Sequence, residues 1–231
     1  MDGVLILGDG LLGREIVNQT GCNFISRKKN GFDVNSKFEI GNYISKPYNT
    51  IINCIACTNT YSMDKQLHWD TNYAFVAKLI EYCNINSLKL VHISTDYVYA
   101  NSVDNASEND VPIHFNNWYS YTKLLADALI ELQSNNYLIC RCTHKPTPFP
   151  YETAWVNQVG NFDYVDIIAK LIIELVNKNA RGLYNVGTQV KSMYDLASRT
   201  KIVNPALKTN YFPENTSMNL NKLNEIKNIS K

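Results

Sequence analysis

Residues 3–19, GVLILGDGLLGREIVNQ, decide the fold class. The first half of this stretch is a short apolar run that predicts a strand, and in the second half apolar residues recur at helical spacing. Gly8, Gly10 and Gly13 form the pattern GxGxxG between the two halves. Glycines in this place allow a tight turn, the close approach of a pyrophosphate and tight helix–sheet packing, while the helix N-terminus offers free amide donors. The stretch predicts a dinucleotide site; the alternative is a glycine turn in another α/β fold.

Strands and helices alternate downstream of this turn. Four runs that are apolar nearly throughout predict strands buried on both faces, at 22–26, 49–56, 89–95 and 137–143. Helical periodicity predicts a crossover helix at 63–83 and another helix at 119–133. This order predicts a Rossmann-like, doubly wound, mostly parallel α/β sheet with ligand at the carboxyl ends of the strands.

The chain changes character after residue 143. Residues 144–153, HKPTPFPYET, carry three prolines and predict a loop, because proline fits neither a helix interior nor a central strand. Beyond it, the pattern predicts a helix at 164–178, a strand at 182–187 and a helix around 193–200. We expect an NAD(P)-binding domain at 1–143 and a reduced substrate-binding lobe at 144–231, partly interwoven with it as one compact unit.

Composition limits the classes of partner. With 231 residues, 45% hydrophobic and 19% charged, and a formal net charge of +1, the chain is typical of globular proteins and gives no electrostatic reason to expect nucleic acid or an anionic membrane. The N-terminal apolar run soon meets Asp9 and glycines, so it predicts neither a signal peptide nor a membrane span. We expect a cytoplasmic protein that binds a small molecule; a homodimer is compatible with the sequence.

Six cysteines lie mostly within apolar runs, which favours reduced, buried thiols. Cys54 and Cys57 form a CxxC, but no second CxxC and no HxxxH follows. The main interpretation is core packing, with a metal or redox site as the alternative. We therefore expect no metal ion.

Candidate catalytic residues lie in two segments. Tyr119 and Lys123 form a YxxxK at the start of a predicted helix, where residues four apart share a face, so an ammonium can lower the pKa of the phenol. The alternative is an ordinary surface helix turn. Thr95 ends a predicted central strand, where its hydroxyl can hold a substrate carbonyl oxygen while tyrosine donates a proton and the nicotinamide donates hydride.

The cofactor preference rests on the end of the second predicted strand. There the sequence is Ser26-Arg27-Lys28-Lys29, where proteins restricted to NAD often carry an acidic residue. A basic run suits the 2′-phosphate of NADPH, so NADPH is favoured over NADH. The alternative is that these cations only keep a loop solvated.

Several segments resemble one known family, the extended short-chain dehydrogenases/reductases, and in particular the dTDP-4-dehydrorhamnose reductases. HISTDYVYA at 92–100 resembles the STDYVF segment of that family. Similar stretches follow the family's order: NCIACTNTYSMDK (53–65), ICRCT (139–143), GNFDYVDIIAKLI (160–172), GLYNVG (182–187) and PENTSMNLNKL (213–223). The resemblance spans nearly the whole chain.

This resemblance implies reduction of a nucleotide-linked 4-keto-6-deoxy sugar by NADPH or NADH, as in dTDP-rhamnose and polysaccharide biosynthesis. It implies that Thr95, Tyr119 and Lys123 are catalytic. The residues it assigns to the cofactor are Gly8, Gly10, Leu11, Leu12, Gly13, Arg27, Asp33, Val34, Ile55, Ala56, Thr58 and Asn72.

The chain also departs from the family. Leu7 stands where the first glycine of GxxGxxG is expected, His144 replaces a tryptophan, and a longer family segment is reduced to KPTPFPYETAW at 145–155. Candidate substrate contacts are Asp96, Tyr97 and His144; alternatively, Asp96 and Tyr97 cap the strand end and His144 is a loop residue without a role.

Two alternative functions follow. One is a nucleotide-sugar epimerase or dehydratase of the same fold. Dehydratases with a similar catalytic set also carry an acidic pair beside the threonine, whereas here Asp96 is the single carboxylate in that place. The other is a non-catalytic, cofactor-binding regulatory subunit.

Overall fold

A parallel sheet forms the centre of the protein. The computed structural model describes residues 1–34, 40–44, 47–100 and 103–228. Within this part of the chain, six strands pair in the order β10-β5-β4-β3-β1-β2, every neighbouring pair parallel. The strands are β1 (Val4–Leu7), β2 (Asn23–Ile25), β3 (Thr50–Asn53), β4 (Lys89–Ser94), β5 (Tyr137–Arg141) and β10 (Gly182–Asn185). The predicted doubly wound parallel sheet is confirmed, and its order reverses between β1 and β3, where such sheets bind ligands.

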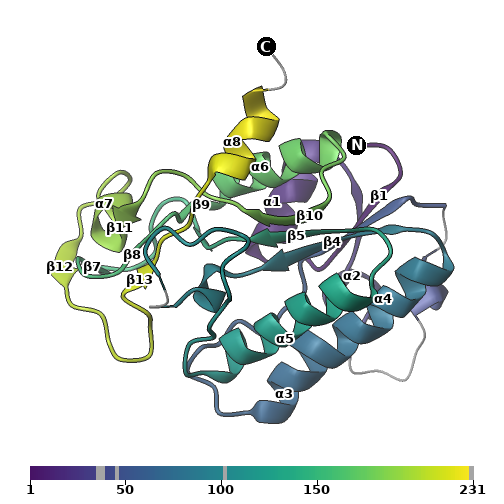
Figure 1. Ribbon diagram of the computed structural model, residues 1–231, viewed down its shortest axis with the longest axis horizontal. Helices are drawn as coiled ribbons and strands as arrows, with labels where there is room; N and C mark the ends of the chain where they lie inside the picture. Colours follow the sequence, from purple (N-terminus) through teal and green to yellow (C-terminus); the bar gives the residue numbers. More distant parts are fainter. Residues whose placement is uncertain (35–39, 45–46, 101–102, 229–231) are drawn as a thin grey trace.

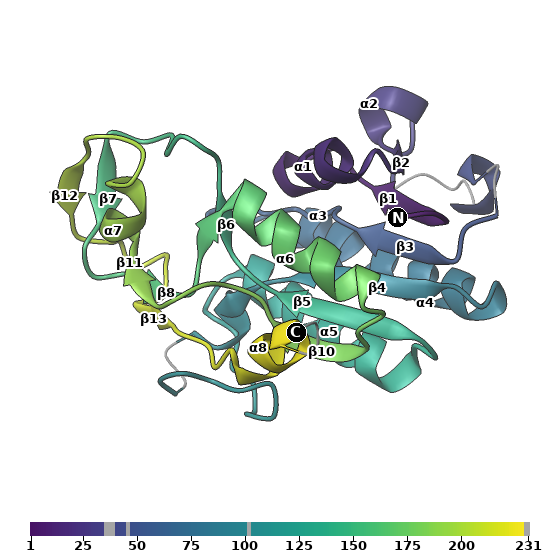
Figure 2. The same ribbon diagram turned by 90° about the horizontal axis from the view of Figure 1, so that it is seen from above.

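Helices cover both faces of the sheet (Figures 1 and 2). Ile6 of β1 belongs to the core beneath α1 (Leu11–Thr20) and α6 (Val165–Asn177). Its neighbour Leu5 belongs to the opposite core, beneath α4 (Phe75–Ile85) and α5 (Trp118–Gln133). Successive side chains of a strand point to opposite faces, so two covered faces require an unbroken apolar run instead of alternation.

The crossover between β3 and β4 is not one regular helix. The sequence predicts a helix at 63–83, whereas the structure has α3 (Lys65–Trp69), a π-helical turn at Asp70–Ala74, and α4. Such turns are rare and frequently occur at functional sites. This one carries Asn72, which reaches across to the segment after β3.

A smaller lobe of short elements lies beyond the carboxyl ends of the strands (Figures 1 and 2). They are β6 (His144–Lys145), β7 (Thr153–Trp155), β8 (Val159–Gly160), β9 (Asp163–Tyr164), β11 (Lys191–Ser192), α7 (Met193–Ala197), β12 (Asn204–Ala206) and β13 (Asn215–Thr216). The predicted loop at 144–153 therefore contains the two-residue strand β6, which pairs with β9.

The chain passes between lobe and sheet more than once. After β9 it returns through α6 and β10 to the central sheet, enters the lobe again at β11, and ends in α8 (Asn221–Asn228) beside β10. The division at residue 143 falls just after β5 and stays a prediction. The topology shows that α6 and β10, both beyond that boundary, belong to the central sheet and its helical cover.

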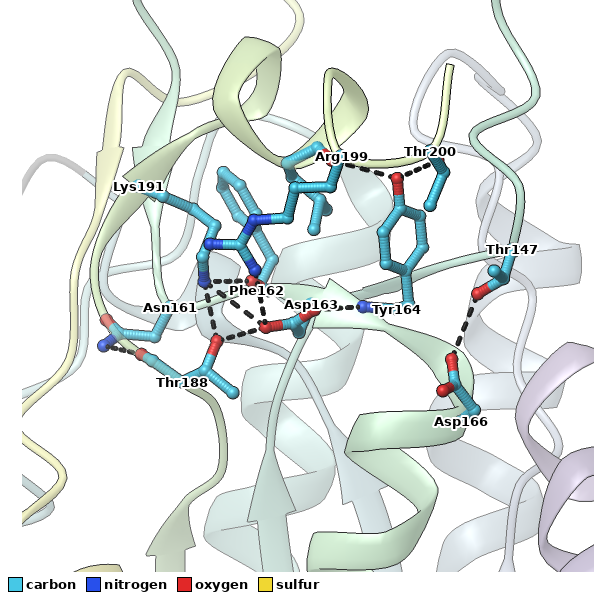
Figure 3. Close-up of polar contacts among 11 residues, drawn as sticks. Thr147, Asn161, Phe162, Asp163, Tyr164, Asp166, Thr188, Lys191, Arg199 and Thr200 are labelled. Atoms are coloured by element: carbon cyan, nitrogen blue, oxygen red, sulfur yellow. Dashed lines mark hydrogen bonds and ion pairs between the residues drawn. The ribbon is translucent and has the colours of Figure 1, made fainter.

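A buried carboxylate joins separate parts of the lobe (Figure 3). Asp163 on β9 accepts a hydrogen bond from Thr188 at 2.5 Å and pairs with Lys191 Nζ at 3.5 Å and with Arg199 at 3.6 Å. Lys191 also donates to the carbonyl of Phe162 at 2.9 Å. Segments that share no continuous sheet are thus held together by one charged centre, which suits a lobe with little regular structure.

Candidate active site

The glycine turn between β1 and α1 has the shape that a dinucleotide needs. Gly8 has a φ of +95°, which side-chain-bearing residues rarely adopt. A Cβ on Gly13 would overlap the carbonyl of Gly8, so the missing side chain lets α1 pack on the turn. A Cβ on Gly10 would meet nothing within 4 Å, and Gly10 starts α1 without a side-chain cap. Open space and free helix amides therefore coincide, as a pyrophosphate requires.

One cleft runs from this turn to the lobe. Its cavity volume is ≈ 790 Å³, within the range of small-molecule sites. Its floor is made by the segments that follow β3, β4 and β5, and its far side by the lobe. The lining residues on the sheet side include Gly10, Leu11, Leu12, Ala56, Thr58, Thr95, Tyr97, Tyr119 and Lys123.

Tyr119 and Thr95 meet on the floor of the cleft. Asn117 caps α5 by accepting the amide of Ser120 at 2.8 Å, which fixes the helix start where Tyr119 lies. Burial raises the pKa of Tyr119, and its hydrogen bond with Thr95 only partly offsets this. The structure therefore brings the two predicted hydroxyls together on the floor of the cleft.

Lys123 contacts His92 and the backbone of β4 beneath the cleft. Its Nζ lies 2.8 Å from Nε2 of His92 and donates to the carbonyl of Ile93 at 2.6 Å. Burial lowers the pKa of Lys123 to about 8 and raises that of Tyr119. Burial thus opposes the predicted lowering of the phenol pKa, and the role of Lys123 stays a prediction.

A buried ion pair supports this floor from behind. Asp127 of α5 accepts hydrogen bonds from Ser94 at 2.9 Å and from Arg141 Nε at 3.0 Å, and Arg141 also donates to the hydroxyl of Tyr99 at 2.5 Å. The side chains of Asp127 and Arg141 are 0% and 2% exposed. They join α5 to the ends of β4 and β5, which keeps the residues of the floor in register.

The three candidate substrate contacts lie in different surroundings. Asp96 is fully buried and accepts from Thr143 at 2.5 Å and from Thr216 of the lobe at 2.8 Å, so its carboxylate joins sheet to lobe. Tyr97 lines the cleft with its ring 6.1 Å from that of Tyr119. His144 lines it too; burial lowers the pKa of His144 to about 4.

The other predicted cofactor residues lie in three kinds of surroundings. Arg27 is the first residue of α2 (Arg27–Asn30), which Ser26 caps. Its side chain is 71% exposed and forms an ion pair with Asp33 at 3.3 Å. Val34 and Ile55 pack against a core. Asn72 is buried behind the cleft wall, where its side chain bonds the N–H of Cys57 at 2.8 Å and its C=O at 3.0 Å.

Sequence reasoning missed an aromatic wall that continues from the segment after β3 to the lobe. Its members are Tyr61, Phe149, Tyr151, Trp155 and Phe212, all lining the cleft. Ring centroids lie 4.4 Å apart for Trp155 and Phe212, and 5.3 Å apart for Tyr61 and Phe212. No periodicity marks them, since they come from three distant segments. Only the aromatic residues within KPTPFPYETAW hint at such a surface.

Lys145 was also missed. It lines the lobe side of the cleft, and its ammonium has no hydrogen-bond or ion-pair partner among the described residues. Burial lowers the pKa of Lys145, while Asp96 opposes this. Within the described lining of the cleft, no side chain is acidic. Anionic ligands are therefore favoured there.

Among the helices that the structure describes, none has the length and apolar character needed to cross a membrane.

Comparisons with known proteins agree with this architecture. A family model described as the RmlD substrate binding domain matches residues 1–144. No curated protein matches the chain.

Solved structures resemble the whole chain. A dTDP-4-dehydrorhamnose reductase from Clostridium acetobutylicum is 20% identical, with a TM-score of 0.82 over 97% of this chain and 92% of that one. The dTDP-4-dehydrorhamnose reductase from Bacillus anthracis in complex with NADP is also 20% identical, with a TM-score of 0.80 over 96% and 90%. MoeE5 in complex with UDP-glucuronic acid and NAD is 17% identical, with a TM-score of 0.78 over 96% and 91%. At these identities the likeness establishes the fold.

Proposed function

Because this chain belongs to the RmlD substrate binding domain family, we propose that it is an NAD(P)H-dependent oxidoreductase that reduces the keto group of a nucleotide-linked 4-keto-6-deoxy sugar. The observation that carries the proposal is the pairing of Tyr119 with Thr95 by a hydrogen bond on the floor of a cleft that begins at the glycine turn. Two solved dTDP-4-dehydrorhamnose reductases share the fold, and one of them was solved in complex with NADP.

The reaction requires a proton where negative charge develops. A bound NAD(P)H supplies the hydride. The hydroxyls of Thr95 and Tyr119 are hydrogen-bonded to each other on the cleft floor, where both can hold the carbonyl oxygen of the sugar. As that oxygen gains charge, Tyr119 donates its proton to it, a role that suits a phenol whose pKa burial keeps high.

The substrate side of the cleft fits a nucleotide sugar. Flat aromatic rings such as Trp155 and Phe212 offer stacking surfaces for a base or a sugar ring. Lys145 offers an unpaired cation for a diphosphate, and the described lining holds no carboxylate to repel it. MoeE5, with the same fold, was solved with UDP-glucuronic acid and with UDP-glucose.

For the cofactor, the exposed Arg27 at the end of β2 supports NADPH over NADH, since a guanidinium binds a 2′-phosphate well. Its ion pair with Asp33 is exposed and therefore weak enough to yield to a phosphate. The protein would act in the cytoplasm, in the synthesis of polysaccharide precursors.

Two alternatives are less well supported. Dehydration uses an acidic pair beside the threonine, and here the single carboxylate, Asp96, faces threonines instead of the cleft. A regulatory subunit would not need Tyr119 and Thr95 kept together.

The experiment combines binding and turnover. NADPH and NADH are titrated by fluorescence, and oxidation of the bound cofactor is followed after adding dTDP- or UDP-4-keto-6-deoxyglucose. Tyr119→Phe is expected to lower kcat by about 10²–10⁴-fold while cofactor affinity stays unchanged, because it removes only the proton donor. Tyr121→Phe is the matched control, since Tyr121 packs against Trp118 outside the cleft. Turnover that survives in Tyr119→Phe would refute the role of Tyr119, and binding without turnover in the wild type would favour the regulatory alternative.

A further inference from the structure

His144 stands where the cleft floor passes into the lobe. It begins β6, and the pairing of β6 with β9 fixes its backbone. Its ring lines the cleft. The chain departs from the family at this position, so the role of His144 has to be argued from its own surroundings. The function proposed above makes no use of it.

The two ring nitrogens of His144 lie in different surroundings. Nδ1 is fully buried and has no hydrogen-bond partner within the part of the chain that the structure describes. Nε2 has no partner among the described residues either, but it does not belong to the fully buried polar atoms. Because the ring lines the cleft, Nε2 is the nitrogen that stays open to a ligand.

Burial also determines which nitrogen carries the proton. Burial and the neighbouring Lys145 lower the pKa of His144 to about 4, so at neutral pH the ring has one N–H and one lone pair. A buried N–H without an acceptor is rarer in proteins than a buried acceptor without a donor. Nδ1 has no acceptor, so it keeps the lone pair and the proton sits on Nε2, directed to the cleft.

We propose that His144 is a specificity-determining residue that donates a hydrogen bond from Nε2 to an oxygen atom of the sugar. The identity of the ligand rests on the proposed function, whereas the position of the ring proton does not.

The place of His144 in the chain points to the sugar as the acceptor. Thr143 lines the cleft and donates at 2.5 Å to Asp96, the residue that follows Thr95. His144 comes directly after Thr143 and before the aromatic residues of the lobe. The part of a nucleotide sugar that reacts beside Thr95 is the sugar ring, so the sugar lies nearest to His144.

A neutral N–H selects for an oxygen atom and adds no charge to the cleft. A hydroxyl or carbonyl oxygen accepts its hydrogen bond, whereas a methyl group in that place would leave the N–H without a partner. A 4-keto-6-deoxy sugar carries oxygen atoms on its ring carbons and a methyl group at C6. His144 therefore orients the sugar with its oxygen atoms, and not its C6 methyl group, towards β6.

The direct test of the ring proton is ¹⁵N NMR of the full-length protein labelled at its four histidines. The signals of His144 are assigned by their loss in His144→Gln. We expect a neutral ring with the proton on Nε2 at pH 7, and a shift of the Nε2–H signal on adding dTDP-glucose. A proton on Nδ1, or on both nitrogens, would overturn the proposal. No turnover is needed, so this result stands apart from any failure of the proposed reduction.

Calorimetry then measures the hydrogen bond to the sugar. Wild-type protein should bind dTDP-glucose more tightly than dTDP. In His144→Leu, which has no donor, the affinity for dTDP-glucose should fall about five- to tenfold, while the affinity for dTDP stays unchanged.

Two amide variants separate loss of the donor from loss of structure. In His144→Gln the side-chain NH₂ reaches the place of Nε2, so the affinity for dTDP-glucose should stay near that of the wild type. His144→Asn is shorter and puts its NH₂ at the place of Nδ1, so it should bind dTDP-glucose as weakly as His144→Leu. A general folding defect would not distinguish the two amides.

The control is His114→Gln, which changes an exposed histidine bonded to Phe115 and should leave every affinity unchanged. If His144→Leu lost affinity for NADPH instead of dTDP-glucose, the donor would serve the cofactor and the proposal would be wrong. Equal binding of dTDP-glucose by the wild type, His144→Leu and His144→Asn would also overturn it, as would a wild type that binds dTDP-glucose no more tightly than dTDP.

Discussion

Gly13 and Gly10 belong to one motif, but the structure gives them different tasks, which two alanine substitutions can separate. A Cβ on Gly13 would lie closer than 3.0 Å to the carbonyl oxygen of Gly8 and 3.2 Å from its carbonyl carbon, where ordinary contact begins at 3.4 Å. Both neighbours are backbone atoms and cannot rotate away. Relief requires a shift of α1 against β1.

The cost can be assessed from these contacts. Overpacking a tight site costs roughly 1–3 kcal/mol, and the shift of two backbone segments places Gly13→Ala near the upper end. Alanine regains about 1 kcal/mol of helix propensity, because Gly13 lies within α1. The net loss is about 2 kcal/mol, which for a chain of this length lowers Tm by roughly 4–8 °C. In Gly10→Ala the methyl group meets no atom, so the fold should lose less than about 1 kcal/mol at this helix start.

Cofactor affinity should show the opposite order. The methyl group of Gly10→Ala occupies the open space beside the cleft, so the Kd for NADPH should rise at least about tenfold, equivalent to about 1.4 kcal/mol. Thermal unfolding by circular dichroism and fluorescence titration measure the two effects. If Gly13→Ala melts within about 1 °C of the wild type, the packing argument is wrong; if Gly10→Ala binds NADPH as the wild type does, Gly10 does not face the pyrophosphate.

Three further predictions concern the surroundings of the cleft. Asp127→Ala should lower the free energy of unfolding, measured by urea denaturation, by about 3–5 kcal/mol, because it leaves Arg141 buried without its partner. Adding Arg141→Met should recover much of that loss. Equal losses in the single and the double variant would contradict this reasoning. Lys145→Met should weaken UDP binding about tenfold in calorimetry and leave NADPH binding intact, while the surface control Lys201→Met changes neither. Burial lowers the pKa of His144 to about 4, so the unfolded chain takes up this proton at a higher pH than the folded chain does. The Tm should therefore fall as the pH drops from about 6.5 towards 4. His144→Phe should flatten this dependence of Tm on pH, and an unchanged dependence would rule out His144 as its source.

Much of the fold could be predicted because its signals are local. The apolar runs of β1, β3, β4 and β5 and the glycine turn each depend on residues close together in the chain. Two covered faces demand continuous apolar strands, and one strand–turn–helix unit demands glycine at fixed places. The interruption at Asp70–Ala74 escaped prediction, because the helical period continues through it while Asn72 is drawn to Cys57 by contacts between distant segments.

The candidate site divides in the same way. Thr95, Tyr119 and Lys123 were predicted from motifs, and the structure brings all three to one cleft. Their roles stay predictions. The pattern YxxxK indicates that phenol and ammonium share a helix face, but it contains no information on burial. Desolvation, which depends on everything packed around α5, raises the pKa of Tyr119 and so opposes the expected shift.

The sequence by itself determined the parallel sheet, the dinucleotide turn and the identity of the residues with chemical potential, because these follow from periodicity and from backbone freedom over a few residues. The tertiary structure decided what those residues face. It turned Asp96 toward threonines of sheet and lobe, gathered an aromatic wall from three segments, and placed His92 between Asn53 and Lys123. Hydrogen-bond direction and desolvation act between residues far apart in the chain, so no local pattern encodes them.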